Sequence, residues 1–114
     1  MQAVRGRVVQ VVVSVPSTRV ATRLAADLLQ QRLCACAQTV GPITSHYRWQ
    51  GKIERAHEWL LVIKTRAALL ERLEAAVLRV HPYDVPEILT VPVHSGSRGY
   101  VQWLQRECAP LRSR

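Results

Sequence analysis

The sequence predicts an α+β domain, a plait built in the order β-α-β-β-α-β with one additional helix at its C-terminus. Three observations lead to this prediction. Residues 7–15 are almost wholly β-branched, and residues 17–33 and 67–80 repeat apolar side chains at helical spacing. Between the two helical segments, residues 35–49 and 52–65 have the pattern of two paired strands.

The composition is that of an ordinary globular domain, with 48% hydrophobic and 21% charged residues. A chain of 114 residues has room for a single core, so residues 1–114 are predicted to form one domain, with 1–6 and 109–114 flexible. No secretory signal is evident, and the longest apolar run, residues 59–63, is far too short to span a bilayer. We therefore expect a cytoplasmic protein with no membrane partner.

The first strand, residues 7–15, is apolar on both faces and is expected in the middle of a covered sheet. Pro16 ends it, and Ser17 is a candidate N-cap for a helix that extends to Leu33. In the strand that follows, Gly41-Pro42 predicts an edge position with a kink or bulge.

Residues 35–49 and 52–65 are each about fourteen residues long, against a usual strand length of about five or six. Gln50-Gly51 is a weak hairpin turn between them. A hairpin this long projects beyond its sheet and exposes a hazardous edge, so we expect protruding hairpins to meet neighbouring chains in an oligomer.

The second helix, residues 67–80, carries a continuous apolar stripe and stops before Pro82. Residues 87–93 form a short strand, and Pro92 places it at an edge. The last helix carries Tyr100, Trp103, Leu104 and Cys108. Together the elements give the ferredoxin-like arrangement, with the first and third strands central.

The segment 81–87, His-Pro-Tyr-Asp-Val-Pro-Glu, is the densest group of chemically active side chains. His81, Asp84 and Glu87 are candidate ligands for Zn(II) or Cu(II), if the segment curls enough to bring them together. In the structural alternative, His81 caps the last carbonyls of its helix, and the prolines end the helix and lead into an edge strand.

Lys64 stands in an apolar central strand, where a lysine is seldom buried without a partner. Asp84, Glu87 or a bound anion can pair with it; alternatively, the strand passes the end of the sheet there and Lys64 lies in water. Aromatic side chains are candidates for the same ligand or interface cleft, with core packing as the alternative for the last three: Tyr47, Trp49, Tyr83, Tyr100 and Trp103. The sequence places Glu58 in a solvated part of the hairpin.

The three cysteines, Cys34, Cys36 and Cys108, are an odd number and favour reduced thiols that pack as small hydrophobes. The net charge of +8 comes from fourteen arginines and two lysines, scattered singly along the chain. The base-stacking aromatics of RNA-recognition modules are missing, so no specific nucleic acid is expected and only electrostatic binding stays open. The chain contains no asparagine, which argues against the small hydrolases that use this plait with an arginine and an asparagine.

The sequence also resembles the CutA family of divalent-cation tolerance proteins from Val8 to Glu107. The matching stretches, in order, are 31–36 (QRLCAC), 45–53 (SHYRWQGKI), 60–65 (LLVIKT), 81–88 (HPYDVPEI) and 99–104 (GYVQWL). Several linked motifs in the same order make the resemblance specific.

This resemblance implies a compact homotrimer assembled through the long hairpins, with no enzymatic activity and a role in tolerance of copper and other divalent metals. Some members are reported to bind copper through a cysteine and a pair of histidines. The matching positions here are Val13 and Val80, with only His81 retained. Trimeric nitrogen-regulatory signalling proteins suggest a further interpretation by analogy of fold, in which a small effector binds between subunits.

Overall fold

The computed structural model describes residues 1–110 and confirms the predicted order of elements. The elements of the plait are β2 (Val8–Val15), α1 (Thr18–Gln30), β3 (Cys36–Trp49), β4 (Lys52–Arg66), α2 (Leu70–Val80) and β5 (Ile88–Pro92), followed by α3 (Arg98–Glu107). The antiparallel sheet has the order β3-β4-β2-β5. The first and third predicted strands are therefore central, and the two strands that contain proline are the edges.

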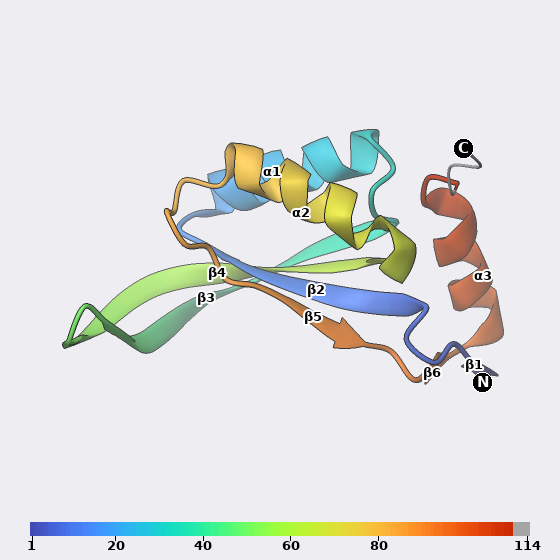
Figure 1. Cartoon of the computed structure of the whole chain (residues 1–114), viewed down its shortest axis with the longest axis horizontal. Helices are drawn as coiled ribbons and strands as arrows, with labels where there is room; N and C mark the ends of the chain where they lie inside the picture. Colours follow the sequence, from blue (N-terminus) through green and yellow to red (C-terminus); the bar gives the residue numbers. More distant parts are fainter. Residues whose placement is uncertain (111–114) are drawn as a thin grey trace.

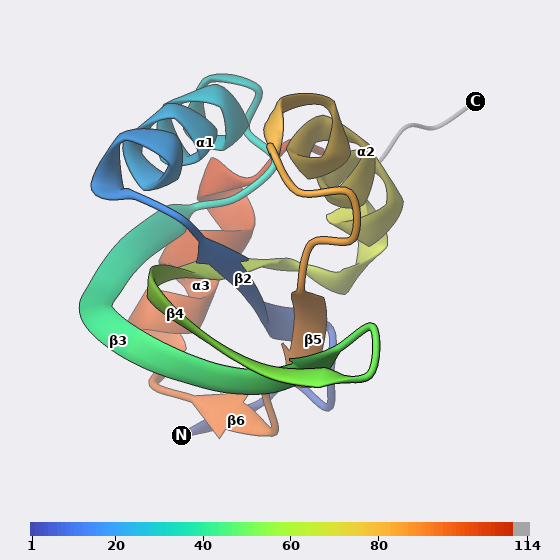
Figure 2. The same ribbon diagram turned by 90° about the vertical axis from the view of Figure 1, so that its left-hand side faces the viewer.

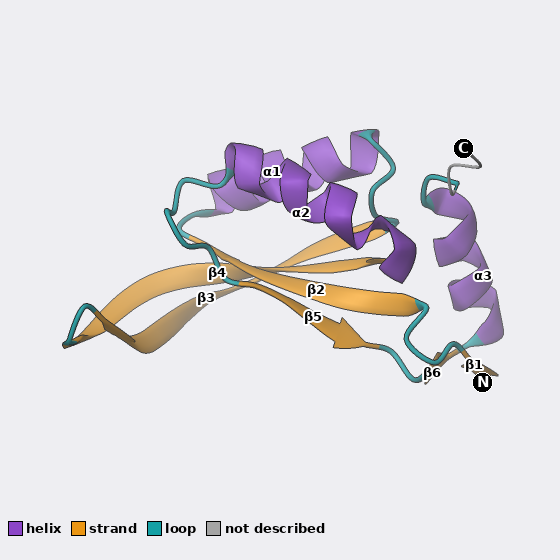
Figure 3. Ribbon diagram, in the orientation of Figure 1, coloured by secondary structure: helices purple, strands orange, loops and turns teal. Residues whose placement is uncertain are grey.

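Both α1 and α2 cover one face of the sheet, and α3 lies beyond its end (Figures 1 and 3). Alternate residues of the central strands point toward the helices, so β2 and β4 supply much of the core. The main buried side chains of this core are Val9, Val11, Val13, Val15, Leu24, Leu28, Leu61, Ile63 and Leu73. Figure 2 shows that, within residues 1–110 of a single chain, no helix lies over the opposite face of the sheet.

The first helix begins as predicted, because the Ser17 hydroxyl accepts a hydrogen bond from the Val20 amide at 3.2 Å. It ends at Gln30, three residues before the predicted Leu33. The cause is Arg32, whose φ of 57° lies in the left-handed region and turns the chain out of the helix. The second helical segment opens with a short 3₁₀ turn, η1 (Ala67–Leu69), and continues as α2.

The hairpin of β3 and β4 projects well beyond the helices and gives the molecule its long dimension of 44 Å (Figure 1). The predicted irregularity in β3 is confirmed as a register shift between Val40 and Ile43. Gln50 and Gly51 form the turn, with φ values of 50° and 79°. Both angles lie in the left-handed region, as a two-residue hairpin turn requires.

A second, smaller packing unit holds α3 against the end of the sheet. β1 (Gln2–Ala3) pairs with β6 (Ser95–Gly96), and Val4 is fully buried beside the apolar face of α3. Residues 1–6 were expected to be flexible, and this pairing of residues 2–3 differs from that expectation. Of the C-terminal range 109–114, residues 111–114 lie outside the described residues.

Candidate functional site

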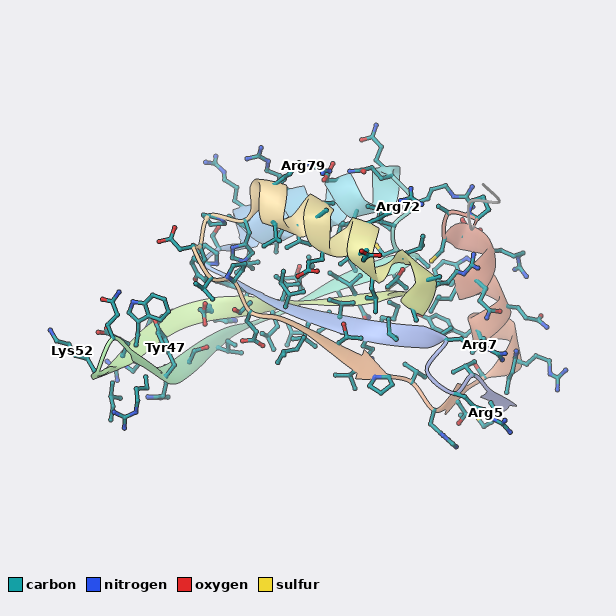
Figure 4. The ribbon with its side chains drawn as sticks, viewed as in Figure 1. Arg5, Arg7, Tyr47, Lys52, Arg72 and Arg79 are labelled. Atoms are coloured by element: carbon teal, nitrogen blue, oxygen red, sulfur yellow. The ribbon has the colours of Figure 1, made fainter. Side chains whose placement is uncertain are left out.

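A cleft of about 660 Å³ opens between the projecting hairpin and the segment that joins α2 to β5. Figure 4 shows Tyr47 on the projecting hairpin. The cleft is lined by Ser14, Ser45, His46, Tyr47, Trp49, Glu58, Pro82, Tyr83, Asp84, Val85 and Glu87. Five of the residues predicted to form a site are among them: Tyr47, Trp49, Tyr83, Asp84 and Glu87.

His81 lies beneath this cleft and is buried, with 8% of its surface exposed. Its Nε2 atom lies 2.7 Å from the Ser14 carbonyl oxygen, which can only accept, so Nε2 carries the proton. Its Nδ1 atom accepts a hydrogen bond from the Tyr83 amide at 3.2 Å. Both ring nitrogens are therefore used within the chain, and the side chain bonds to strand β2 instead of capping its own helix.

Tyr83 connects this segment to the hairpin. Its hydroxyl donates to Glu58 Oε2 at 2.8 Å, and its ring lies 4.8 Å from the imidazole of His81 between centroids. Burial raises the pKa of the Tyr83 phenol above its usual value, and the hydrogen bond and negative charge of Glu58 raise it further. Tyr83 thus stays neutral and donates to a carboxylate that is only 7% exposed.

The predicted metal site is not assembled within one chain. Among residues 1–110, no three histidine, cysteine, aspartate or glutamate side chains lie close enough to hold a metal ion. His81 is separated from Asp84 and Glu87 by its own hydrogen bonds, whereas the two carboxylates face the cleft. The separation has a physical cause. Hydrogen bonds to Ser14 and Tyr83 hold the imidazole in a buried position, whereas Asp84 and Glu87 are exposed to solvent.

Two of the three positions that the resemblance links to copper binding are apolar here. Val13 is fully buried in the main core, and Val80 is partly buried against the same core. Neither side chain offers a lone pair to a metal.

Lys64, Tyr100 and Trp103 do not line the cleft. Lys64 lies on the face of the sheet without helices, and its ammonium group donates to the Gln38 side-chain oxygen instead of pairing with Asp84 or Glu87. Tyr100 and Trp103 are 44% and 37% exposed and lie near each other on α3, at a centroid distance of 5.5 Å. Burial, together with the neighbouring Cys36 thiol, raises the pKa of Tyr100.

Sequence reasoning missed Glu58 as a site residue because it treated this part of the hairpin as solvated. Side chains alternate between the two faces of a strand, so Glu58 lies on the same face of β4 as Leu60 and Val62. This alternation could have predicted that Glu58 lies on the face opposite the helices. The contributions of Ser14 and Ser45 depend on how the hairpin curves over β2, and no local pattern marks them.

Three comparisons identify the relatives of this chain. A model of the family described as CutA1 divalent ion tolerance protein matches residues 9–107. The divalent-cation tolerance protein CutA of Thermus thermophilus is 42% identical over 95 residues, which cover 83% of this chain and 92% of the relative. Protein CutA of Homo sapiens is 40% identical over 103 residues, which cover 90% of this chain and 58% of the relative.

A chloroplastic CutA protein of Arabidopsis thaliana is 43% identical over 95 residues, covering 83% of this chain and 52% of that protein. The chain thus spans little more than half the length of these two eukaryotic relatives.

Solved structures agree with this relationship. The divalent cation tolerance protein of Thermus thermophilus superposes with a TM-score of 0.88 at 39% identity, covering 90% of this chain and 99% of that one. CutA1 of Oryza sativa gives a TM-score of 0.88 at 37% identity, with coverages of 92% and 96%. Because sequence and fold agree over most of its length, the chain belongs to the CutA1 family of divalent ion tolerance proteins.

Proposed function

We propose that this protein acts in tolerance of divalent cations as a non-enzymatic homotrimer, and that the cleft beside Tyr83 binds the cation or a small effector. The observation that carries this proposal is the lining of the cleft, which includes Glu58, Asp84 and Glu87 and, among residues 1–110, no lysine or arginine. Three carboxylates in one concave site attract cations even though the chain as a whole carries a charge of +8.

The trimer is supported by apolar surface that a single chain leaves open. On the uncovered face and edge of the sheet, Val40, Leu89 and Val91 are 48%, 59% and 48% exposed. The hairpin adds Trp49 and Ile53, which are 45% and 74% exposed. Large apolar side chains exposed on the same elements often mark protein–protein interfaces, and packing against two further copies would cover these.

For the cation, we propose Cu(II) or Zn(II). Carboxylate oxygens and the imidazole of His46, which also faces the cleft, are suitable ligands for both ions. Because one chain does not supply three close ligands within residues 1–110, a bound ion would keep water ligands or take a further ligand from a neighbouring subunit. We therefore expect weak and exchangeable binding rather than a closed structural site.

The test combines native mass spectrometry of protein purified without chelators with calorimetric titration of Cu(II) and Zn(II). We expect a trimer, and metal binding that weakens about tenfold in Glu87→Gln or Asp84→Asn, because each change removes one charged ligand. Glu74→Gln, an exposed residue of α2, is the matched control and should leave binding unchanged. Equal binding by all four proteins, or no binding by the wild type, would refute the cation site.

A small organic effector is the second candidate. The cleft volume of about 660 Å³ lies within the range typical of ligand sites, and Tyr47, Trp49 and Tyr83 provide aromatic surface on its walls. The same mass spectra distinguish the two candidates, because an organic effector adds a mass that matches no metal ion and that persists after treatment with a chelator.

We further propose a cytoplasmic location. Among residues 1–110, no helix is long and apolar enough to cross a membrane. Relatives are described both as chloroplastic, in Arabidopsis thaliana, and as periplasmic, in Archaeoglobus fulgidus. Fractionation of the native host with compartment markers tests this, and recovery outside the cytoplasmic fraction would contradict it.

A further inference from the structure

A second concave site lies at the end of the molecule opposite the projecting hairpin, between the last residue of β4 and helix α3 (Figure 1). It has a volume of about 430 Å³. Among residues 1–110, its lining consists of two arginines and two glutamines, with no carboxylate: Arg66, Gln102, Gln105 and Arg106. These four residues form what we call the arginine groove.

The spacing of residues on α3 builds one wall of the arginine groove. Gln102, Gln105 and Arg106 stand at positions i, i+3 and i+4 and therefore share one face of the helix. The opposite wall is Arg66, whose Nη1 donates to the carbonyl oxygen of Ala109 at 3.2 Å. This hydrogen bond holds the Arg66 guanidinium beside the C-terminal end of α3 before any ligand arrives.

Further positive charge lies close to the arginine groove. Arg7 precedes Val8, which pairs directly with Arg66 in the sheet, and Figure 4 shows Arg5 and Arg7 at the α3 end of the molecule. The carboxylates Glu58, Asp84 and Glu87 line the cleft beside the hairpin instead. The described linings of the two sites therefore differ in charge, acidic in the cleft and cationic in the groove, and an anion is attracted to the second.

We propose that the arginine groove binds a small phosphate-bearing anion, a site independent of the cation-tolerance function proposed above. A planar carboxylate is satisfied by one guanidinium fork, whereas the terminal oxygens of a phosphate group can accept from two arginines and two amides at once. The side-chain amides also offer acceptors for a protonated phosphate oxygen. None of the described residues that line the groove is an aromatic on which a base could stack, so a small phosphate fits better than a nucleic-acid strand.

The test is calorimetric titration of the full-length protein with inorganic diphosphate, and with orthophosphate and citrate for comparison. We expect diphosphate to bind most tightly and citrate most weakly, with an affinity that falls as salt is raised. Arg106→Gln should weaken diphosphate binding about tenfold, because it removes a charge-assisted hydrogen bond. Gln102→Glu, which adds a negative charge at the same surface, should weaken it by at least as much.

The matched control is Arg79→Gln, an exposed arginine at the end of α2 that points away from α3 (Figure 4), which removes the same charge away from the groove and should change binding by less than about twofold. Gln102 and Arg106 are exposed, so both groove variants are expected to fold, and thermal unfolding checks this. Equal losses in Arg79→Gln and Arg106→Gln would show only diffuse charge attraction and overturn the proposal. The proposal is also overturned if wild type does not bind diphosphate, or if single-stranded RNA binds the groove more tightly than diphosphate does.

Discussion

The imidazole of His81 is joined to the main chain of Ser14, with Nε2 lying 2.7 Å from the carbonyl oxygen. The pairing of β2 with β5 ends at Val13 and Ile88, so the Ser14 carbonyl lies just beyond the last pair of that ladder. His81 supplies a donor there and fixes the start of the segment that forms one wall of the cleft. The histidine that the sequence marked as a candidate metal ligand is a structural element of the cleft.

Replacement of His81 by alanine is expected to destabilise the protein by about 1–3 kcal/mol, because it leaves a buried carbonyl of Ser14 without its donor. Urea unfolding of the variant measures this. His94→Ala, at an exposed histidine, is the control and should change the free energy of unfolding by less than about 0.5 kcal/mol. Similar stability of the His81 and His94 variants would contradict the structural role.

Periodicity made the fold predictable. The β-branched run of β2 and the alternation in β4 identify central strands, and Pro42 and Pro92 identify the edges. The end of α1 was predicted wrongly, because Arg32 leaves the helical region to donate hydrogen bonds to carbonyls of α3 more than seventy residues away. A tertiary contact of that kind leaves no trace in local spacing.

The candidate site was predictable only in part, for the same reason. The many chemically active side chains in residues 81–87 and the aromatic residues of the hairpin predicted several residues that line the cleft. The partners were missed, because His81 bonds to a residue 67 positions away and Tyr83 to Glu58, 25 positions away. Composition identified which groups are chemically active, and only the fold determines which of them meet.

Val91→Glu is expected to dissociate the proposed trimer while leaving the chain folded. Val91 is 48% exposed on the face of the sheet without helices, so a charge there costs little in a single chain and much in an apolar interface. Sedimentation equilibrium should shift from three times the chain mass toward 12.9 kDa. Leu78→Glu, at a 50% exposed position on α2, is the matched control and should stay assembled. A wild type that sediments as a monomer, or a Val91→Glu protein that remains a trimer, counts against this face as the interface.

The three thiols are expected to differ in reactivity. Burial raises the pKa of Cys34 to about 12, with smaller contributions from Cys108 and Cys36, so Cys34 stays protonated and unreactive near neutral pH. Cys108 is also buried, at 2% exposure. Labelling with a thiol reagent should modify these two only on unfolding, more than about a hundredfold more slowly than a free thiol. Rapid labelling of either one in the folded protein would contradict the packing described.

Cys36 should instead report on assembly. It pairs with Lys64, Lys64 with Gln10, and Gln10 with Val91, so Cys36 and Val91 stand in one row across the sheet. An interface over this face protects Cys36, and Val91→Glu should therefore accelerate its labelling. The Cys36→Ser variant shows which part of the labelling comes from Cys36, because that part is missing in it. Equal labelling rates of Cys36 in wild type and Val91→Glu would argue against a shared interface.

The hydrogen bond between Tyr83 and Glu58 should make stability depend on pH in the alkaline range. Because burial and Glu58 raise the pKa of Tyr83 above the unfolded value of about 10, the folded chain keeps the phenol neutral where the unfolded chain ionises it. The stabilisation is fully present below about pH 10 and is lost as the pH rises toward the folded-state pKa. Urea unfolding of wild type and Tyr83→Phe between about pH 8 and about pH 11 measures it. The advantage of the wild type, about 1 kcal/mol at the lower pH, should shrink as the pH rises. A difference that stays constant across this range would show that Tyr83 ionises alike in both states, and that the bond to Glu58 does not hold the hairpin to the segment after α2.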